Sequence, residues 1–368
     1  ERDLRQLESD EKGNLALKQE GLIHYFLAKI YDARKEPYKV VKELMAASEK
    51  DPTNPVYNRT LADFYYSKRE YAKAVEQFEN CVTNNPNEID CYIGLGRNYL
   101  AMSRPDKSLF KMEGAAKIAP NNAEIAFLTG QSLEGLFQPD KALEQYQKAI
   151  NLDPNGVAYY TAAAAIFLKR NDLPKAGEFI QKAKLIDAAS PLVHNFLGLM
   201  HVSQNEIDLA QEQFLKAIES NKEFLDAHLN LANVYRGINR FEDAIREYQE
   251  VLSLDEKNDQ AYYGMGRTYF IMTENEKAVA EYEKALGLNK NNYEYFYHAG
   301  LAYFSLYETA KSGKRRPVVV IGKDSIKKIP AEGENAADEA APEPIMPEEN
   351  EMQQSEAMLK KSLDAFTH

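Results

Sequence analysis

Small and apolar side chains recur along this chain at intervals of 34 residues. Within each interval, the apolar residues follow the three- and four-residue spacing of amphipathic helices. One column holds a small residue in every unit: Ala28, Ala62, Gly96, Gly130, Ala164, Gly198, Ala232, Gly266 and Gly300. A mostly aromatic column follows three residues later: Tyr31, Tyr65, Tyr99, Leu133, Phe167, His201, Tyr235, Tyr269 and Tyr303. The spacing predicts a first helix in each unit, with its small residues facing a close neighbour.

Three further columns keep the same period and predict a second helix. The first is mostly Ala: Val40, Ala74, Ser108, Ala142, Ala176, Ala210, Ala244 and Ala278. The second is large: Leu44, Phe78, Met112, Tyr146, Ile180, Phe214, Tyr248 and Tyr282. The third is small again: Ala47, Cys81, Ala115, Ala149, Ala183, Ala217, Val251 and Ala285. No residue is inserted or lost between 21 and 292, so the register is continuous.

The unit 54–86 shows the pattern completely. Its first helix carries Leu61, Ala62 and Tyr65 on one face; its second carries Ala74, Phe78 and Cys81, and Pro86 closes it. This pairing resembles the tetratricopeptide repeat. One column departs from the family: the chain has no Trp at repeat position 4, where Tyr92, Tyr160, Tyr262 or His228 stands. The resemblance implies an all-α, right-handed superhelical α-solenoid of antiparallel helix pairs.

The 34-residue register also predicts how the chain is divided into segments. Residues 1–20 are charged, with leucines spaced for a short amphipathic helix, and we expect an N-terminal cap or arm. Eight contiguous repeats follow over 21–292, and 293–310 is the first helix of a ninth. Residues 311–354 form an insertion, basic and then acidic, whose composition predicts disorder in its later half. Residues 355–368 restore the small–large–small spacing and are the displaced second helix of repeat nine.

Asparagine also recurs at the turn between helices, at Asn171, Asn205 and Asn239. Asn tolerates the left-handed backbone that ends a helix. Pro37 and Pro139 share the position where the second helix begins, and there a missing N–H costs little.

The amino-acid composition argues against several classes of partner. The net charge is −12, from 57 acidic and 45 basic residues, which argues against nucleic acid or an anionic membrane as the main partner. No apolar run approaches a membrane span. The two cysteines are no disulfide framework, and Cys81, at a small core position, is expected to be a buried thiol. The sequence begins at Glu1, so the compartment stays open: cytoplasmic, or periplasmic if an upstream signal was removed.

Candidate catalytic and metal sites are better explained by the repeat. His194 and His201 lie two turns apart but occupy packing columns. Gly94/Gly96 and Gly264/Gly266 fall inside first helices and are read as close-packing glycines, not phosphate loops. The stretch 318–323 lacks the first Gly of a phosphate-binding loop. We therefore expect no metal, no cofactor and no enzyme activity.

The resemblance implies that first helices line a concave groove through repeat positions 2, 5, 9, 12 and 13. The early groove is polar, the middle apolar and the late part aromatic. The expected partner contacts are Phe127, Thr161, Ala165, Leu168, Leu192, Asn195, Leu199, Val202, Tyr263, Arg267, Phe270, Tyr297 and Phe304. An exposed apolar stripe of this kind favours a binding surface.

The predicted function is therefore a non-catalytic scaffold or adaptor that holds a partner peptide or helix in the groove. The carboxylate clamp of chaperone-tail binders is absent, because no repeat position 5 is Lys. Long arrays with this regular spacing occur in bacterial assembly proteins for envelope machines, pili and motility, and this resemblance is at the level of the fold alone. The alternatives are a regulatory or targeting module of a larger enzyme, and a self-assembling scaffold. We also expect the apolar stretch 317–321 to dock on the late groove at Tyr263, Phe270, Tyr297 and Phe304.

Overall fold

The computed structural model describes residues 2–290 and 292–312, and side chains from residue 15 to 309 apart from position 291. The chain divides into two compact units, Glu1–Asp187 and Ala188–His368. Helices account for the regular structure throughout the described ranges, which contain no strand. The expected displaced second helix at 355–368, the insertion beyond Ser312 and the docking stretch 317–321 all lie outside the described residues.

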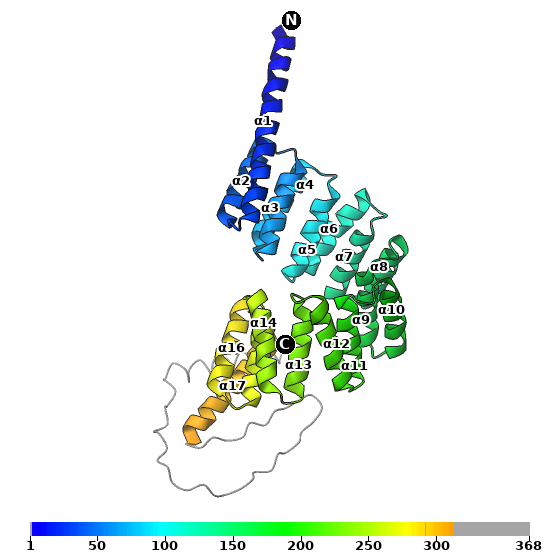
Figure 1. Ribbon diagram of the computed structural model, residues 1–368, viewed down its shortest axis with the longest axis vertical. Helices are drawn as coiled ribbons and strands as arrows, with labels where there is room; N and C mark the ends of the chain where they lie inside the picture. Colours follow the sequence, from blue (N-terminus) through cyan, green and yellow to red (C-terminus); the bar gives the residue numbers. More distant parts are fainter. Residues whose placement is uncertain (1, 291, 313–368) are drawn as a thin grey trace. The chain divides into compact units, whose positions relative to one another are not determined.

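Unit 1 is a row of antiparallel helix pairs (Figure 1). Its helices are α1 (Arg2–Ala33), α2 (Pro37–Lys50), α3 (Pro55–Ser67), α4 (Tyr71–Asn84), α5 (Ile89–Ala101), α6 (Pro105–Ile118), α7 (Ala123–Gly135), α8 (Pro139–Leu152), α9 (Val157–Lys169) and α10 (Leu173–Ile186). Odd-numbered helices are the first helices of the repeats, and even-numbered helices are the second. The all-α solenoid of helix pairs predicted from the periodicity is confirmed.

Unit 2 continues the same alternation. Its helices are α11 (Pro191–Ser203), α12 (Ile207–Ser220), α13 (Leu225–Gly237), α14 (Phe241–Leu254), α15 (Asp259–Ile271), α16 (Asn275–Leu288) and α17 (Tyr293–Ser312). Each first helix contacts its own second helix, and α11, α13, α15 and α17 also contact one another in succession. In unit 1, α3, α5 and α7 do the same. The side-by-side first helices form a surface that we call the first-helix face.

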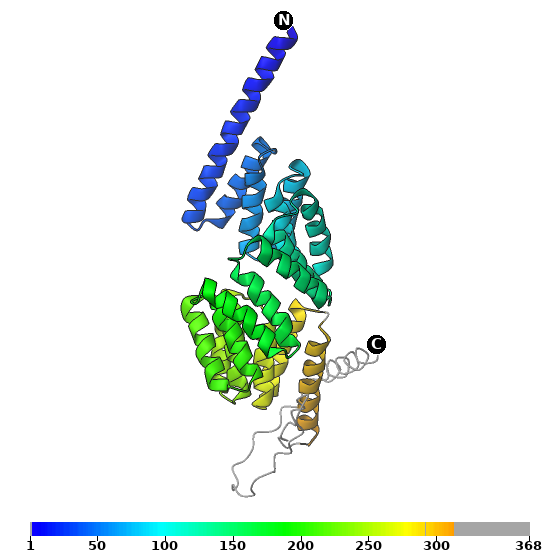
Figure 2. The ribbon, with the colours of Figure 1, turned by 90° about the vertical axis from the view of Figure 1, so that its right-hand side faces the viewer.

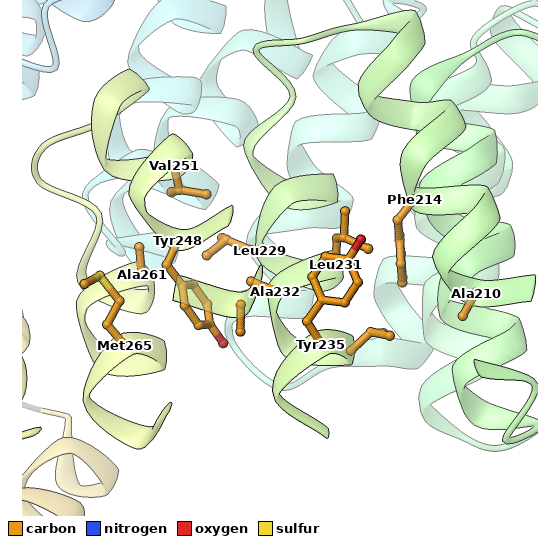
Figure 3. Packing of buried hydrophobic residues seen from close by; sticks show 12 residues of the cluster. Ala210, Phe214, Leu229, Leu231, Ala232, Tyr235, Tyr248, Val251, Ala261 and Met265 are labelled. Atoms are coloured by element: carbon orange, nitrogen blue, oxygen red, sulfur yellow. The ribbon is translucent and has the colours of Figure 1, made fainter. Parts of the chain in front are cut away.

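The core of each repeat consists of the predicted columns. In α12, Phe214 is fully buried between Ala210 and Ala217, which are also fully buried. Figure 3 shows the next layer in unit 2, with Tyr248 of α14 lying among core residues of α13 and α15. Small residues on the first helix are needed because a large ring lies against them. A Cβ atom on Gly198 would stand 2.5 Å from Cε1 of Phe214.

The turn between the two helices has the same backbone in eight successive repeats. The residue at repeat position 15 has a φ between 55° and 62° in every one of them: Lys35, Arg69, Ser103, Phe137, Asn171, Asn205, Asn239 and Thr273. The left-handed conformation predicted for the three asparagines is confirmed. It also occurs with side chains that disfavour it, because the helix pair fixes the turn geometry whatever residue stands there.

The N-terminal region, which was expected to be a cap or arm, continues without a break into the first repeat. Residues 2–33 form one continuous helix, α1, whose N-terminal half extends beyond its partner α2 in Figures 1 and 2. The first repeat therefore begins in the middle of a long helix. Leu22, Phe26 and Ile30 lie one turn apart along it and are about half exposed.

The buried thiol expected at Cys81 is wrong. Cys81 of α4 and Cys91 of α5 form a disulfide bond, with their Cα atoms 6.2 Å apart, and both residues are fully buried. The physical reason lies in the repeat register. The small column on a second helix packs against the first helix of the next repeat, so Cys91, two residues into α5, faces Cys81 directly. The bond joins neighbouring repeats.

Candidate partner-binding surface

The predicted contact residues come from five first helices in the two units. Unit 1 holds Phe127 on α7 and Thr161, Ala165 and Leu168 on α9. Unit 2 holds Leu192, Asn195, Leu199 and Val202 on α11, Tyr263, Arg267 and Phe270 on α15, and Tyr297 and Phe304 on α17. The structure thus brings these residues together within each unit, as two separate parts of the first-helix face.

Among the predicted contact residues of unit 1, the accessible side chains are apolar. Phe127 is half buried, with its ring 5.1 Å from that of Tyr159 and 5.8 Å from that of Tyr146. Ala165 and Leu168 are also half buried. Thr161 contributes little, because it is buried and its hydroxyl donates to the carbonyl of Ala158 at 3.1 Å. Phe127, Ala165 and Leu168 are the side chains that remain available to a partner.

In unit 2, α11 presents a comparable row. Val202 is 39% exposed, whereas Leu192 and Leu199 are half buried, and Leu199 packs on the core cluster beneath it. Asn195 is buried, and its Oδ1 accepts a hydrogen bond of 2.9 Å from Nδ2 of Asn230 on α13. That amide pair links two neighbouring first helices, so its role here is structural.

The early groove was expected to be polar, and ion pairs link charged side chains of neighbouring repeats there. Arg59 on α3 bonds Asp90 on α5 and lies 3.4 Å from Glu88. Arg97 on α5 pairs in the same way with Glu124 on α7. These pairs join consecutive first helices, and because they are partly exposed, each contributes little to stability.

The late groove was expected to be an aromatic surface, but part of its aromatic set is buried and polar groups surround the remaining rings. Phe270 is only 7% exposed and belongs to the core between α15 and α17, so it offers little surface to a partner. The ring of Tyr263 stacks on that of Tyr295 at 4.5 Å. Tyr297 is half buried with its ring edge-on to His298, and Phe304, 48% exposed, is the largest accessible apolar side chain of the set.

Polar atoms occupy the space around these rings. The hydroxyl of Tyr263 donates to Oε1 of Glu294 at 2.9 Å and lies 3.0 Å from Nδ1 of His298. The guanidinium of Arg267 lies over the Tyr263 ring, 5.8 Å from its centroid. Arg236 on α13 donates to the hydroxyl of Tyr248 at 3.0 Å. This part of the first-helix face is cationic and rich in hydrogen-bonding groups.

Burial shifts the titration of this group of residues. It raises the pKa of Tyr263 and lowers that of His298, so the phenol is protonated and the imidazole neutral at pH 7. Burial also lowers the pKa of Arg236, although a guanidinium keeps its charge throughout the physiological range.

Sequence reasoning passed over Arg236 and Tyr282, although signals for both were present. Arg236 stands at repeat position 12, one of the positions that point into the groove. Tyr282 was assigned to the core column, where its ring lies, and its polar end was not considered. The phenols of that column reach beyond the core to the first-helix face: the Tyr146 hydroxyl donates to Glu134 at 2.9 Å and the Tyr248 hydroxyl to Asn233 at 2.8 Å.

A surface hollow of unit 1 lies away from the predicted groove. It measures about 530 Å³, is lined by Leu143, Phe167 and Phe179 among others, and opens between α8, α9 and α10. It is a shallow depression that shares no residue with the predicted groove, and its lining also includes Glu144 and Lys148.

The described residues contain no group of three His, Cys, Asp or Glu side chains placed to hold a metal ion. His194 bonds Gln213 at 2.9 Å and His201 bonds Glu206 at 2.7 Å, so each imidazole has a partner of its own. None of the described helices combines the length and apolarity needed to cross a bilayer.

Comparison with known proteins agrees with the repeat. Models described as TPR repeat or tetratricopeptide repeat match residues 60–88, 130–192, 232–272 and 259–292. The chain contains tetratricopeptide repeats, a class of protein-interaction modules that are generally non-catalytic scaffolds. No match is found among curated proteins.

Solved structures show the same fold. Yeast Tom70 is similar with a TM-score of 0.56 and 20% identity, over 82% of this chain and 64% of that one. Cut9, in the hetero-tetramer of the APC/C proteins Cut9 and Hcn1, gives a TM-score of 0.54 and 17% identity, over 75% of this chain. The chain spans 54% of the length of that protein. At these identities the likeness concerns the fold alone.

Proposed function

We propose that this chain is a non-catalytic scaffold that holds a peptide or helix of a partner protein on its first-helix face. The observation that supports this most directly is the apolar row on α11, where Leu192, Leu199 and Val202 follow one another at helical spacing with part of each side chain accessible. Exposed apolar groups arranged in a row are typical of binding surfaces. Phe127, Ala165 and Leu168 provide a second apolar area in unit 1.

A long, regular array also supports the more specific proposal of a role in a bacterial assembly of the envelope, a pilus or the motility apparatus. The Cys81–Cys91 bond supports a compartment outside the reducing cytosol, because disulfides persist mainly in oxidising surroundings. The periplasm fits both observations. Mass spectrometry of the chain isolated from its native cells under alkylating conditions tests this: a free, alkylated Cys81 would contradict it.

The binding surface is tested by Val202→Glu with Leu215→Glu as its matched control. The two residues are similarly exposed, at 39% and 43%, and belong to the same unit, but Leu215 lies on the second helix α12. A charge on α11 should reduce partner capture at least tenfold, because the carboxylate would have to be desolvated against an apolar partner. The control should capture normally, with the same circular-dichroism spectrum. Equal capture by both variants would contradict the assignment.

A further inference from the structure

A cationic cluster on the first-helix face of unit 2 lacks the anions that would balance it. Its two arginines are Arg236 on α13 and Arg267 on α15, and neither has a carboxylate partner among the described side chains. The exposed arginines of this unit differ, since Arg240 and Arg246 both pair with Asp243. Two positive charges kept without counter-charges on one face favour an anionic ligand.

The second observation is a buried hydroxyl with nothing to bond. Tyr282 of α16 is fully buried, and its phenol oxygen has no hydrogen-bond partner in the described part of the chain. A buried hydroxyl without a hydrogen-bond partner lowers the stability of the folded state. Such a group in a native protein is usually satisfied by a bound ligand, ion or water. The equivalent phenols Tyr146 and Tyr248 each donate to a side chain on their own first helix. In repeat eight, Phe270 stands at the position of Glu134 and Arg267 at the position of Asn233. Neither side chain can accept a hydrogen bond, so the phenol of Tyr282 has no acceptor on its own first helix.

The hydroxyl and the arginines belong to one site. The Tyr282 ring lies 5.9 Å from the ring of Tyr263 and 6.3 Å from that of His298. Burial raises the pKa of Tyr282, while the nearby charges of Arg267 and Arg236 act in the opposite direction. The phenol is therefore a donor under physiological conditions, and it lies within the field of both guanidinium groups.

Among the described side chains, the acid that contacts the site is Glu294, which already accepts a hydrogen bond. Its Oε1 accepts from the Tyr263 hydroxyl, and it is an exposed residue near the start of α17. It forms no ion pair with Arg236 or Arg267 within the described residues. Two fixed cations and one buried hydroxyl donor thus converge without an acceptor, which is the arrangement that recognises a carboxylate.

We propose that this cluster binds the carboxylates of an extended acidic segment, and that its occupant is the chain's own acidic stretch, residues 332–351. That stretch holds eight acidic side chains and no basic one. It begins 20 residues after the end of α17 at Ser312, a length that can reach roughly 60 Å when extended. The apolar stretch 317–321 supplies no side-chain acceptor for Tyr282 or the arginines, so charge favours the acidic stretch.

The proposal is independent of the apolar row on α11. It adds a regulatory contact in which the chain covers part of its own first-helix face with an acidic segment. A partner with an acidic segment of its own would then have to displace it. Closing such a loop costs little more for a long linker than for a short one, so modest charge attraction is enough.

Competition in the full-length chain tests the proposal. The probe is a fluorescein-labelled synthetic peptide of residues 331–351, and its binding is followed by anisotropy at low salt. We compare the natural chain with a full-length variant in which the eight acids of 332–351 are changed to Gln or Asn. The neutralised chain should bind the probe at least tenfold more tightly, since its site is vacant. Equal affinity for the two chains would overturn the proposed occupant, and no binding to the neutralised chain would overturn the site.

Single changes in the neutralised chain then locate the site. Tyr282→Phe removes only the open hydroxyl and should weaken probe binding about tenfold, as expected for a lost hydrogen bond to a charged group. Arg267→Gln should weaken it at least as much, and Arg246→Gln, an exposed control on α14, should leave it unchanged. The unfolding midpoint should stay constant or rise for Tyr282→Phe, because no existing bond is broken. Unchanged probe affinity in both Tyr282→Phe and Arg267→Gln would refute the site.

Discussion

Gly198 tests whether close approach of the two helices within a repeat is what the small column provides. A methyl group at Gly198 would stand 2.5 Å from Cε1 and 2.7 Å from Cδ1 of Phe214. Carbon atoms in contact normally lie about 3.5–4.0 Å apart. Phe214 is fully buried, so its ring has no empty space to move into without displacing neighbours. Gly198→Ala must therefore shift α11 relative to α12 or push the ring off its rotamer.

The magnitude follows from two opposing terms. Overpacking of a dense core costs about 1–3 kcal/mol, whereas replacing Gly with Ala inside a helix gains about 1 kcal/mol. The net loss for Gly198→Ala is then about 1 kcal/mol, and Gly198→Leu should exceed about 2 kcal/mol. Gly287 in α16 is the matched control, because a Cβ there meets no atom within 4 Å. Gly287→Ala should stabilise unit 2 by up to about 1 kcal/mol.

Urea unfolding followed by far-ultraviolet circular dichroism measures the difference. The natural chain contains no Trp, so its 23 tyrosines supply the fluorescence signal as a second probe. A double variant, Gly198→Ala with Phe214→Leu, should lose less stability than the sum of its single changes, because the smaller side chain relieves the clash. The reasoning is refuted if Gly198→Ala is as stable as Gly287→Ala, since the methyl group would then have space.

Three further predictions follow from individual residues. The Cys81–Cys91 bond closes a loop of sequence separation 10. Its reduction should lower the unfolding free energy by about 2–3 kcal/mol, and an unchanged urea midpoint in reductant would contradict this prediction. Phe137 has a φ of 58°, which Gly adopts more readily, and its side chain is 92% exposed, so little packing is lost with it. Phe137→Gly should therefore raise the unfolding free energy by about 1 kcal/mol. A lower melting temperature would count against the left-handed turn. The hydrogen bond that His228 donates to the carboxylate of Glu247 raises the pKa of His228 above its ordinary value of 6.5. The native state therefore holds this proton more tightly than the unfolded state, and stability should fall as the pH rises above 6.5 through the raised native pKa. His228→Asn should flatten that profile, and an unchanged slope would show that another group titrates.

Most of the fold could be predicted because the same pattern of small and large residues recurs in successive repeats. The small and large columns specify which faces of successive helices meet, and Gly198 against Phe214 shows the match at atomic scale. The turn at Asn171 was predictable from its own chemistry. The same turn at Phe137 was not, because there the helix pair imposes a backbone that the side chain disfavours.

The remaining features depend on contacts between repeats. The disulfide required knowing that the small column of one repeat faces the third residue of the next, which places Cys91 against Cys81. The late surface was interpreted from its rings, yet the polar ends of Tyr263 and Tyr282 determine its character. The repeat position of a residue predicts where its Cα and Cβ atoms lie. For a long polar side chain such as Tyr, it does not predict which groups the terminal hydroxyl contacts.

Site-specific photo-crosslinking tests the central claim most directly. A photoreactive benzoylphenylalanine replaces Val202 on the first-helix face or Leu215 on the second helix α12, both about 40% exposed in the full-length chain. On irradiation in native cells, position 202 should form a covalent adduct with another protein, and position 215 should not. Adducts of equal yield from the two positions, or adducts from position 215 alone, would contradict partner binding on the first-helix face.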